Sequence, residues 1–161
     1  MYFKIDLKIF LFLVLFYFTG QIKTYALILV FALIHELGHL VAGLMVGMKP
    51  NKLEIKPYGV SISFDILPKD YNKKMMRGNI LELKKAVVAT AGPLTNLLII
   101  CIAANLEISV VTSLMIIYSN LILIIFNLIP IYPLDGGRIF KSLSYIIFGK
   151  KKSETYTNNF S

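Results

Sequence analysis

The sequence contains little charge and almost no cysteine. Charged residues make up 16% of the 161 residues and apolar residues 57%. Soluble domains average about 25% charged and about 45–50% apolar residues. These proportions argue against a disordered chain, a nucleic-acid-binding domain and an ordinary soluble enzyme. The single cysteine, Cys101, excludes an intramolecular disulfide and with it a disulfide-stapled secreted fold. The length allows one domain at most, and the composition is typical of an integral membrane protein.

Runs with little or no charge predict where the chain crosses the membrane. A helix needs about 20 apolar residues to cross a bilayer core about 30 Å thick. Such runs predict spans at residues 24–48, 86–106 and 108–132. A shorter run at residues 9–22 lies between lysines that can snorkel, and it predicts a retained anchor rather than a cleaved signal peptide. The predicted fold is therefore an all-α polytopic membrane protein of about four transmembrane helices.

The loop between the second and third spans, residues 49–85, has a different pattern. Apolar and polar residues alternate in two short runs, residues 53–55 and 60–64, on either side of Pro57-Tyr58-Gly59. This alternation predicts a short β-hairpin at the membrane surface.

Basic residues indicate the orientation. If the N-terminus is cytoplasmic, every Lys and Arg except Lys23 lies inside, and residues 49–85 form a cytoplasmic loop. We therefore predict a multi-pass protein of the cell membrane, with its N-terminus and the loop of residues 49–85 toward the cytoplasm. It divides into a membrane core, residues 1–149, and a polar basic tail, residues 150–161.

Three ionisable groups lie together in the second predicted span, in the HExxH pattern His35-Glu36-Leu37-Gly38-His39. A carboxylate at mid-membrane costs about 2.5–3.5 kcal/mol, so such a cluster predicts a function. Residues four apart share one helix face, and two imidazoles so placed can bind one Zn²⁺. Glu36 lies beside that metal position and can serve as a general base. The pattern thus predicts Zn²⁺ as the cofactor.

A catalytic zinc needs a third protein ligand. Asp135 follows the last apolar run, before Gly136-Gly137, where it can meet the cytoplasmic end of the second span. Its glycine pair permits a tight turn. We predict that Asp135 is the third ligand, in preference to an interfacial aspartate that merely pairs with Arg138.

Several other residues within the spans allow two interpretations. Asn96 and Asn127 either satisfy backbone groups freed by nearby prolines, or border the active site and bind substrate. Both interpretations stay open. Gly43 and Gly47 form a GxxxG pair, which predicts helix packing.

Three motifs in order resemble the site-2 protease family of intramembrane zinc metalloproteases: His35-Glu36-Leu37-Gly38-His39, Gly92-Pro93-Leu94-Thr95-Asn96 and the stretch from Asn127 to Arg138. The resemblance implies that His35, His39 and Asp135 are zinc ligands and that Glu36 is the catalytic base. It also implies a zinc metalloendopeptidase that cleaves a membrane-tethered precursor, such as a pro-sigma factor in sporulation.

The resemblance also raises alternatives. Sporulation members of the family continue with further spans and a cytosolic CBS domain that this sequence lacks, so a minimal member and a truncated product are both open. Two other functions are a metal-binding membrane transporter and a catalytically inactive scaffold that binds a precursor. The apolar outer half of the second span, residues 25–34, disfavours a transporter. The intact Glu36 disfavours a scaffold, whereas the lack of the further spans favours one. The expected partners are a membrane-tethered protein substrate and the lipid bilayer, with no nucleic acid; inhibitory membrane partners stay open.

Overall fold

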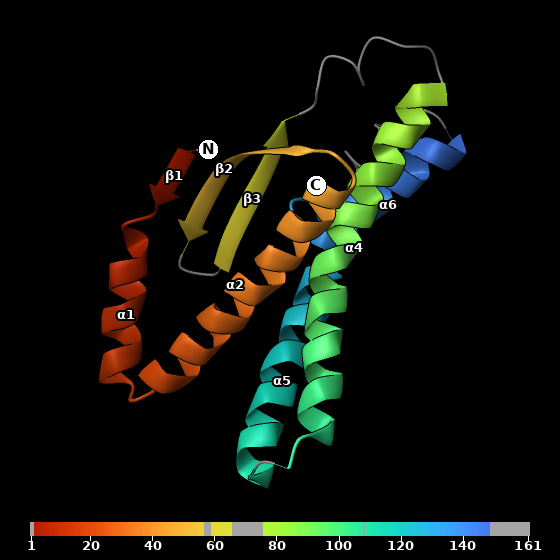
Figure 1. The fold of residues 1–161 in the computed structure, drawn as a ribbon. Coiled ribbons are helices and arrows are strands. Elements are labelled where there is room, and N and C mark those ends of the chain that lie inside the picture. Colours follow the sequence, from red (N-terminus) through yellow and green to blue (C-terminus); the bar gives the residue numbers. More distant parts are fainter. Residues whose placement is uncertain (1, 57–58, 66–75, 108, 149–161) are drawn as a thin grey trace.

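Three long helices lie side by side, with a small sheet and a further helix at one end (Figure 1). The computed structural model describes residues 2–56, 59–65, 76–107 and 109–148. In chain order the elements are β1 (Tyr2–Ile5), α1 (Lys8–Phe18), α2 (Ile22–Met45), β2 (Lys49–Lys56), β3 (Gly59–Asp65), α4 (Met76–Asn105), α5 (Val110–Asn127) and α6 (Asp135–Phe148). The predicted tail, residues 150–161, lies outside the described residues.

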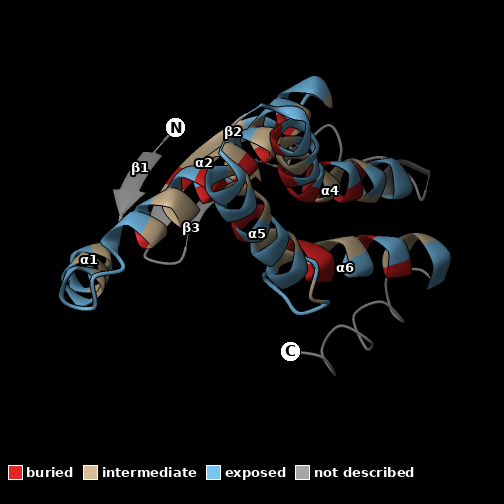
Figure 2. Cartoon of the chain, turned by 90° about the horizontal axis from the view of Figure 1, so that it is seen from below, coloured by how far each residue is buried: buried red, intermediate tan, exposed pale blue. Residues whose placement is uncertain are grey.

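The three long helices are also the ones that can cross a membrane. Within the described residues, α2, α4 from Asn79 onward and α5 are long and apolar enough to span. Large apolar side chains remain on the outside of this bundle, as at Leu98, Ile125 and Phe126, which are 61%, 57% and 62% exposed. Buried residues lie on the sides where the helices meet (Figure 2). The outward apolar surface is that of a protein surrounded by lipid.

The first predicted span is shorter than expected. α1 contains 11 residues, which extend about 17 Å, against the roughly 30 Å of a bilayer core. The structure therefore has three helices of spanning length and one short apolar helix, where the sequence predicted about four spans.

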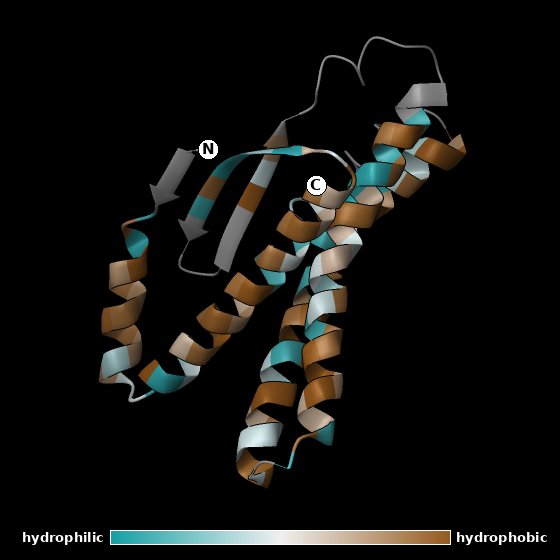
Figure 3. Cartoon of the chain, viewed as in Figure 1, coloured by the Kyte–Doolittle hydropathy of each residue, from teal (hydrophilic) through white to brown (hydrophobic). Residues whose placement is uncertain are grey.

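The predicted hairpin is present and carries an additional strand. β2 and β3 pair antiparallel, with Leu53 opposite Ile62, and both side chains are buried. β1 pairs parallel to the other edge of β2, so the order is β1-β2-β3. Hydrophilic residues gather on β2 and at the nearby end of α4, away from the apolar lower part of the bundle (Figure 3).

The two glycines of the GxxxG pair do not pack helices together, so that prediction is wrong. A Cβ at Gly43 would lie 2.2 Å from the Phe64 ring of β3, so this glycine lets the strand approach α2. Gly47 has φ +77° and follows the last turn of α2, where the Met48 N–H donates to the Gly43 carbonyl oxygen at 2.8 Å. The pair thus ends the helix and docks β3 beside it.

Helix α6 was not predicted from the sequence. α5 ends at Asn127, earlier than the predicted span, and a non-helical stretch leads to Asp135, the first residue of α6. A Cβ at Gly136 would lie 2.2 Å from the Leu128 carbonyl oxygen, and one at Gly137 would lie 2.5 Å from the Ile131 backbone. The glycine pair therefore belongs to the helix and lets its first turn lie against the preceding backbone, which fixes the position of Asp135.

Candidate metal centre

Helix α2 presents its two histidines on one face, one turn apart. Their rings lie edge to face with centroids 4.8 Å apart, and the Nε2 atoms are 3.1 Å from each other. Both residues are only 3% exposed. The i, i+4 spacing of the sequence motif thus brings two ligand atoms to one point inside the bundle.

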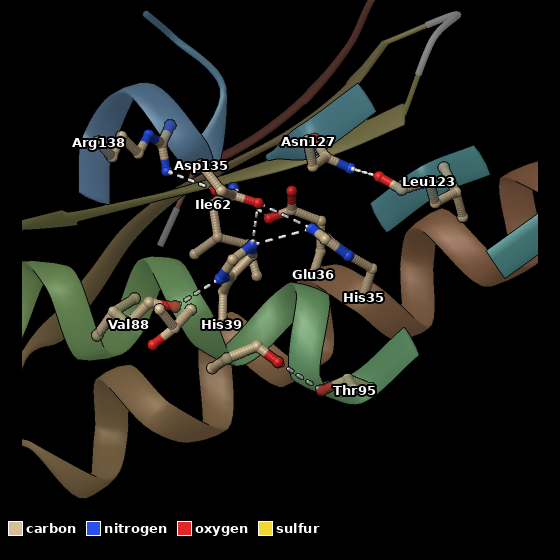
Figure 4. A network of polar contacts seen from close by, with 12 residues as sticks. His35, Glu36, His39, Ile62, Val88, Thr95, Leu123, Asn127, Asp135 and Arg138 are labelled. Atoms are coloured by element: carbon tan, nitrogen blue, oxygen red, sulfur yellow. Dashed lines mark hydrogen bonds and ion pairs between the residues drawn. The ribbon is translucent and has the colours of Figure 1, made fainter. Parts of the chain in front are cut away.

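Asp135 reaches the same point from α6. Its Oδ2 lies 3.0 Å from His35 Nε2 and 3.1 Å from His39 Nε2 (Figure 4). Burial alone would raise the pKa of Asp135, but the His35 and His39 rings hold it at about 2. The carboxylate is therefore charged at neutral pH. The Arg138 guanidinium lies 4.0 Å from the other oxygen, Oδ1, so the ion pair that was the disfavoured alternative coexists with the contact to the histidines.

These three atoms fit a metal ion. A tetrahedral zinc with ligand bonds of about 2.0–2.1 Å places its ligand atoms roughly 3.3–3.4 Å apart, close to the observed separations. His39 Nδ1 donates to the Val88 carbonyl oxygen at 2.7 Å, so in the neutral ring Nε2 presents a lone pair. That lone pair faces the Asp135 carboxylate, and two acceptors so close repel each other unless a proton or a cation lies between them. Imidazole nitrogen and carboxylate oxygen are zinc ligands, so His35, His39 and Asp135 form a possible zinc site.

Gly92 of α4 forms a wall of this site. A Cβ placed there would lie 2.4 Å from His39 Nε2 and 2.5 Å from His35 Nε2. The space beside the ligand atoms is therefore open because residue 92 has no side chain. The sequence motif contained this glycine without indicating what it does.

Glu36 lies beside the histidines and is held by the sheet. Its Oε2 accepts a hydrogen bond from the Ile62 backbone N–H of β3 at 3.1 Å. The side chain is half-buried. A carboxylate that is adjacent to a metal position and oriented by a fixed donor can accept a proton from a water molecule.

The two asparagines for which substrate binding is one of two open interpretations have different surroundings. Asn127 is half-buried, and its Nδ2 donates to the Leu123 carbonyl oxygen in its own helix at 3.0 Å. Asn96 is 0% exposed, and its amide has no hydrogen-bond partner among the described residues. Their role in binding substrate stays a prediction.

A pocket of about 310 Å³ opens beside the site between β3, α4 and α6. Its lining includes three residues that contact the site: Ile62, Val88 and Arg138. The backbone N–H of Ile62 and the backbone carbonyl of Val88 were missed from the sequence, because any residue type supplies them.

Comparison with known proteins finds similarity to metalloproteases. The model of Peptidase family M50 matches residues 102–161, which contain Asp135. Stage IV sporulation protein FB of Bacillus subtilis is 29% identical over 83% of this chain and 43% of its own length. A zinc metalloprotease of Methanocaldococcus jannaschii is 29% identical over 84% of this chain and 38% of its own. The chain thus spans less than half the length of these relatives.

A solved structure supports the fold. The site-2 protease from Methanocaldococcus jannaschii superposes with a TM-score of 0.66 at 24% identity, covering 98% of this chain and 73% of that one. The family resemblance drawn from the three sequence motifs is confirmed by these matches. The chain is thus similar to members of peptidase family M50, the site-2 protease family of membrane metalloproteases.

Proposed function

We propose that this chain is a zinc-dependent intramembrane endopeptidase. It would hydrolyse a peptide bond in or near the membrane segment of a tethered precursor. The observation that carries the proposal is the convergence of two imidazole nitrogens and one carboxylate oxygen within 3.1 Å of one another, beside a glutamate. His35, His39 and Asp135 are the proposed zinc ligands, and Glu36 is the proposed general base.

The chain's own residues would supply binding and proton transfer. A bound zinc ion acts as a Lewis acid and lowers the pKa of a coordinated water to about 7. Glu36 would take the proton from the attacking water and return it to the nitrogen of the leaving amine as the C–N bond breaks. The Ile62 N–H orients the Glu36 carboxylate for both transfers.

The substrate must be extended to be cleaved, because a helix hides its carbonyls in its own hydrogen bonds. We expect the unwound segment to pair with the hairpin. β2 lies between β1 and β3, so of the two hairpin strands β3 has the outer edge. The pocket beside β3 borders the proposed catalytic residues and would receive part of such a segment.

We also propose an orientation in the membrane and a substrate. The charge distribution supports a cytoplasmic N-terminus, with the sheet, α6 and the site on that side. Residues 1–149 would form the catalytic core. The similarity to a sporulation protein supports a membrane-tethered pro-sigma factor as the substrate to test first.

The test is cleavage of a tagged, membrane-tethered pro-sigma precursor co-expressed with the wild-type chain or with Glu36→Gln. Matched protein level and zinc content are the controls. Removal of a general base is expected to slow cleavage by about 10²–10⁴-fold while zinc remains bound. Equal cleavage by both proteins would contradict the role of Glu36. A zinc-loaded wild type that binds the precursor without cutting it would favour the inactive scaffold.

A further inference from the structure

Four buried side-chain atoms have no hydrogen-bond partner among the described residues. They are His35 Nδ1, both amide atoms of Asn96 and Asn120 Oδ1. The two asparagines are the largest side chains that are fully buried, each 0% exposed. A buried polar group left unpaired costs about 1–3 kcal/mol, so a group of such atoms requires a physical explanation.

The register between α2 and α4 puts Asn96 at the level of His35. Val88 contacts His39, and Gly92, one turn later, lies against both histidines. Helices α2 and α4 are therefore antiparallel, as Figure 1 also shows. Asn96 follows Gly92 by four residues on the same face of α4. It therefore lies toward the His35 end of the histidine pair.

The register between α4 and α5 puts Asn120 opposite Asn96. Ser113 Oγ donates to the Ala103 carbonyl oxygen at 2.9 Å, which fixes one point of contact between these antiparallel helices. Asn96 lies seven residues, about two turns, before Ala103 on α4. Asn120 lies seven residues after Ser113 on α5, so the two asparagines are at the same level of the antiparallel pair. The unpartnered atoms on three different helices thus belong to one level of the bundle.

We propose that these groups bind at least one structural water that positions His35 for the metal. With Nε2 as a metal ligand, the His35 ring carries its hydrogen on Nδ1 and needs an acceptor there. His39 has the Val88 carbonyl oxygen for this purpose. The water would accept a hydrogen bond from His35 Nδ1–H and donate one to each amide oxygen of Asn96 and Asn120. About three hydrogen bonds are usual for a buried water.

Asn96 and Asn120 are then positioning residues, which act on the metal through His35. This role differs from direct substrate binding by Asn96. It concerns the metal site of the proposed function and not the cleavage step, so it can be tested whether or not the chain cuts a precursor.

The direct test uses the unmodified, zinc-loaded chain in lipid nanodiscs, labelled with [¹⁵N]histidine. Because the sequence has only two histidines, NMR will observe two imidazole rings, each with one protonated nitrogen. We expect cross-relaxation with a long-lived water at one ring N–H and none at the other, which donates to a carbonyl. Absence of a water contact at both rings would overturn the proposal. A chain that binds no zinc would contradict the metal centre, while the water contact remains measurable in the metal-free protein.

Variants provide a second measurement by zinc competition with a chelator. Asn96→Leu and Asn120→Leu should each weaken zinc binding by about 10–100-fold, the usual effect of losing a partner of a ligand histidine. The control is Asn105→Leu, because Asn105 is exposed and bonds within its own helix to the Cys101 carbonyl oxygen. Zinc affinity that is unchanged in both buried variants, or equally reduced in the control, would overturn the proposal. If Asn96→Leu does not fold, the NMR measurement decides.

Discussion

At the scale of single residues, the candidate metal centre is open because residue 92 is a glycine. Gly92 leaves open the space beside His35 Nε2 and His39 Nε2, which a Cβ would approach to 2.4–2.5 Å. No real Cβ can occupy that position without displacing a ring, and both rings are buried. The glycine is therefore required by the space of the site and not by its backbone conformation.

Gly92→Ala is expected to abolish stoichiometric zinc binding, because the new methyl group would lie 2.4 Å from His39 Nε2 and 2.5 Å from His35 Nε2. The measurement is zinc content per chain after purification into nanodiscs. Thr90→Ala on the same helix is the matched control, since its hydroxyl bonds only to carbonyls of α4 itself. If Gly92→Ala still bound one zinc ion per chain, the described geometry of the site would be contradicted.

The side chains of the candidate site were predicted from the sequence, whereas its backbone groups were not. The positions of His35, Glu36 and His39 follow from helix periodicity, and Asp135 followed from its place after the last apolar run and the need of a two-histidine pair for a third ligand. The structure brings the three proposed ligands together. The Val88 carbonyl and the Ile62 N–H could not be predicted, because backbone groups have no residue signature and reach the site only through tertiary packing.

At the scale of elements, strand β3 and helix α2 form one unit. The Phe64 ring fills the space over Gly43, and the Ile62 N–H donates to Glu36. Because this N–H points to α2, it takes no part in the pairing of β3 with β2. The sheet thus orients the proposed general base through a backbone donor at the strand's outer edge.

Replacing Ile62 with proline removes that donor without removing a hydrogen bond of the β2–β3 ladder. We expect kcat to fall by about tenfold or more relative to Ile62→Ala, since a hydrogen bond to a charged group is worth about 1.5–3 kcal/mol. The alanine variant loses the buried side chain but keeps the N–H, so it controls for packing. Equal kcat values for the two variants, at equal zinc content, would show that the Ile62 N–H does not orient Glu36.

Elements were predicted from the sequence where their pattern is long or regular. The apolar runs predicted α2, α4 and α5, and alternation predicted the hairpin of β2 and β3. β1 and α6 were not predicted, because four residues give too little pattern for a strand and a glycine pair suggested a turn. The length of α1 was overestimated, since apolar residues continue beyond the point where the helix ends at Phe18.

At the scale of the whole molecule, the arrangement separates an apolar bundle from a polar end. The sheet, α6 and the start of α4 share one end, and the proposed site lies where these elements meet α2. Because nearly all basic residues fall in the segments that the sequence predicts to be cytoplasmic, we expect this end to face the cytoplasm. Water would then reach the site from the cytoplasmic side.

This orientation can be measured by labelling single cysteines in intact cells. Cys101, which lies in α4, is first replaced by serine, and a cysteine is then introduced at the exposed positions Ser63 or Glu107. A membrane-impermeant maleimide should label the Glu107→Cys protein in intact cells and the Ser63→Cys protein only after lysis. The reverse pattern would overturn the predicted topology.

We propose that one zinc ion is held by both histidines and the Asp135 carboxylate. Zinc K-edge X-ray absorption of the purified chain in nanodiscs tests it most directly, because the sequence has only two histidines and one cysteine. We expect scattering from two imidazoles and from oxygen ligands at about 2.0–2.2 Å, with zinc lost in Asp135→Ala. A spectrum with fewer than two imidazoles, or with sulfur at about 2.3 Å, would contradict it.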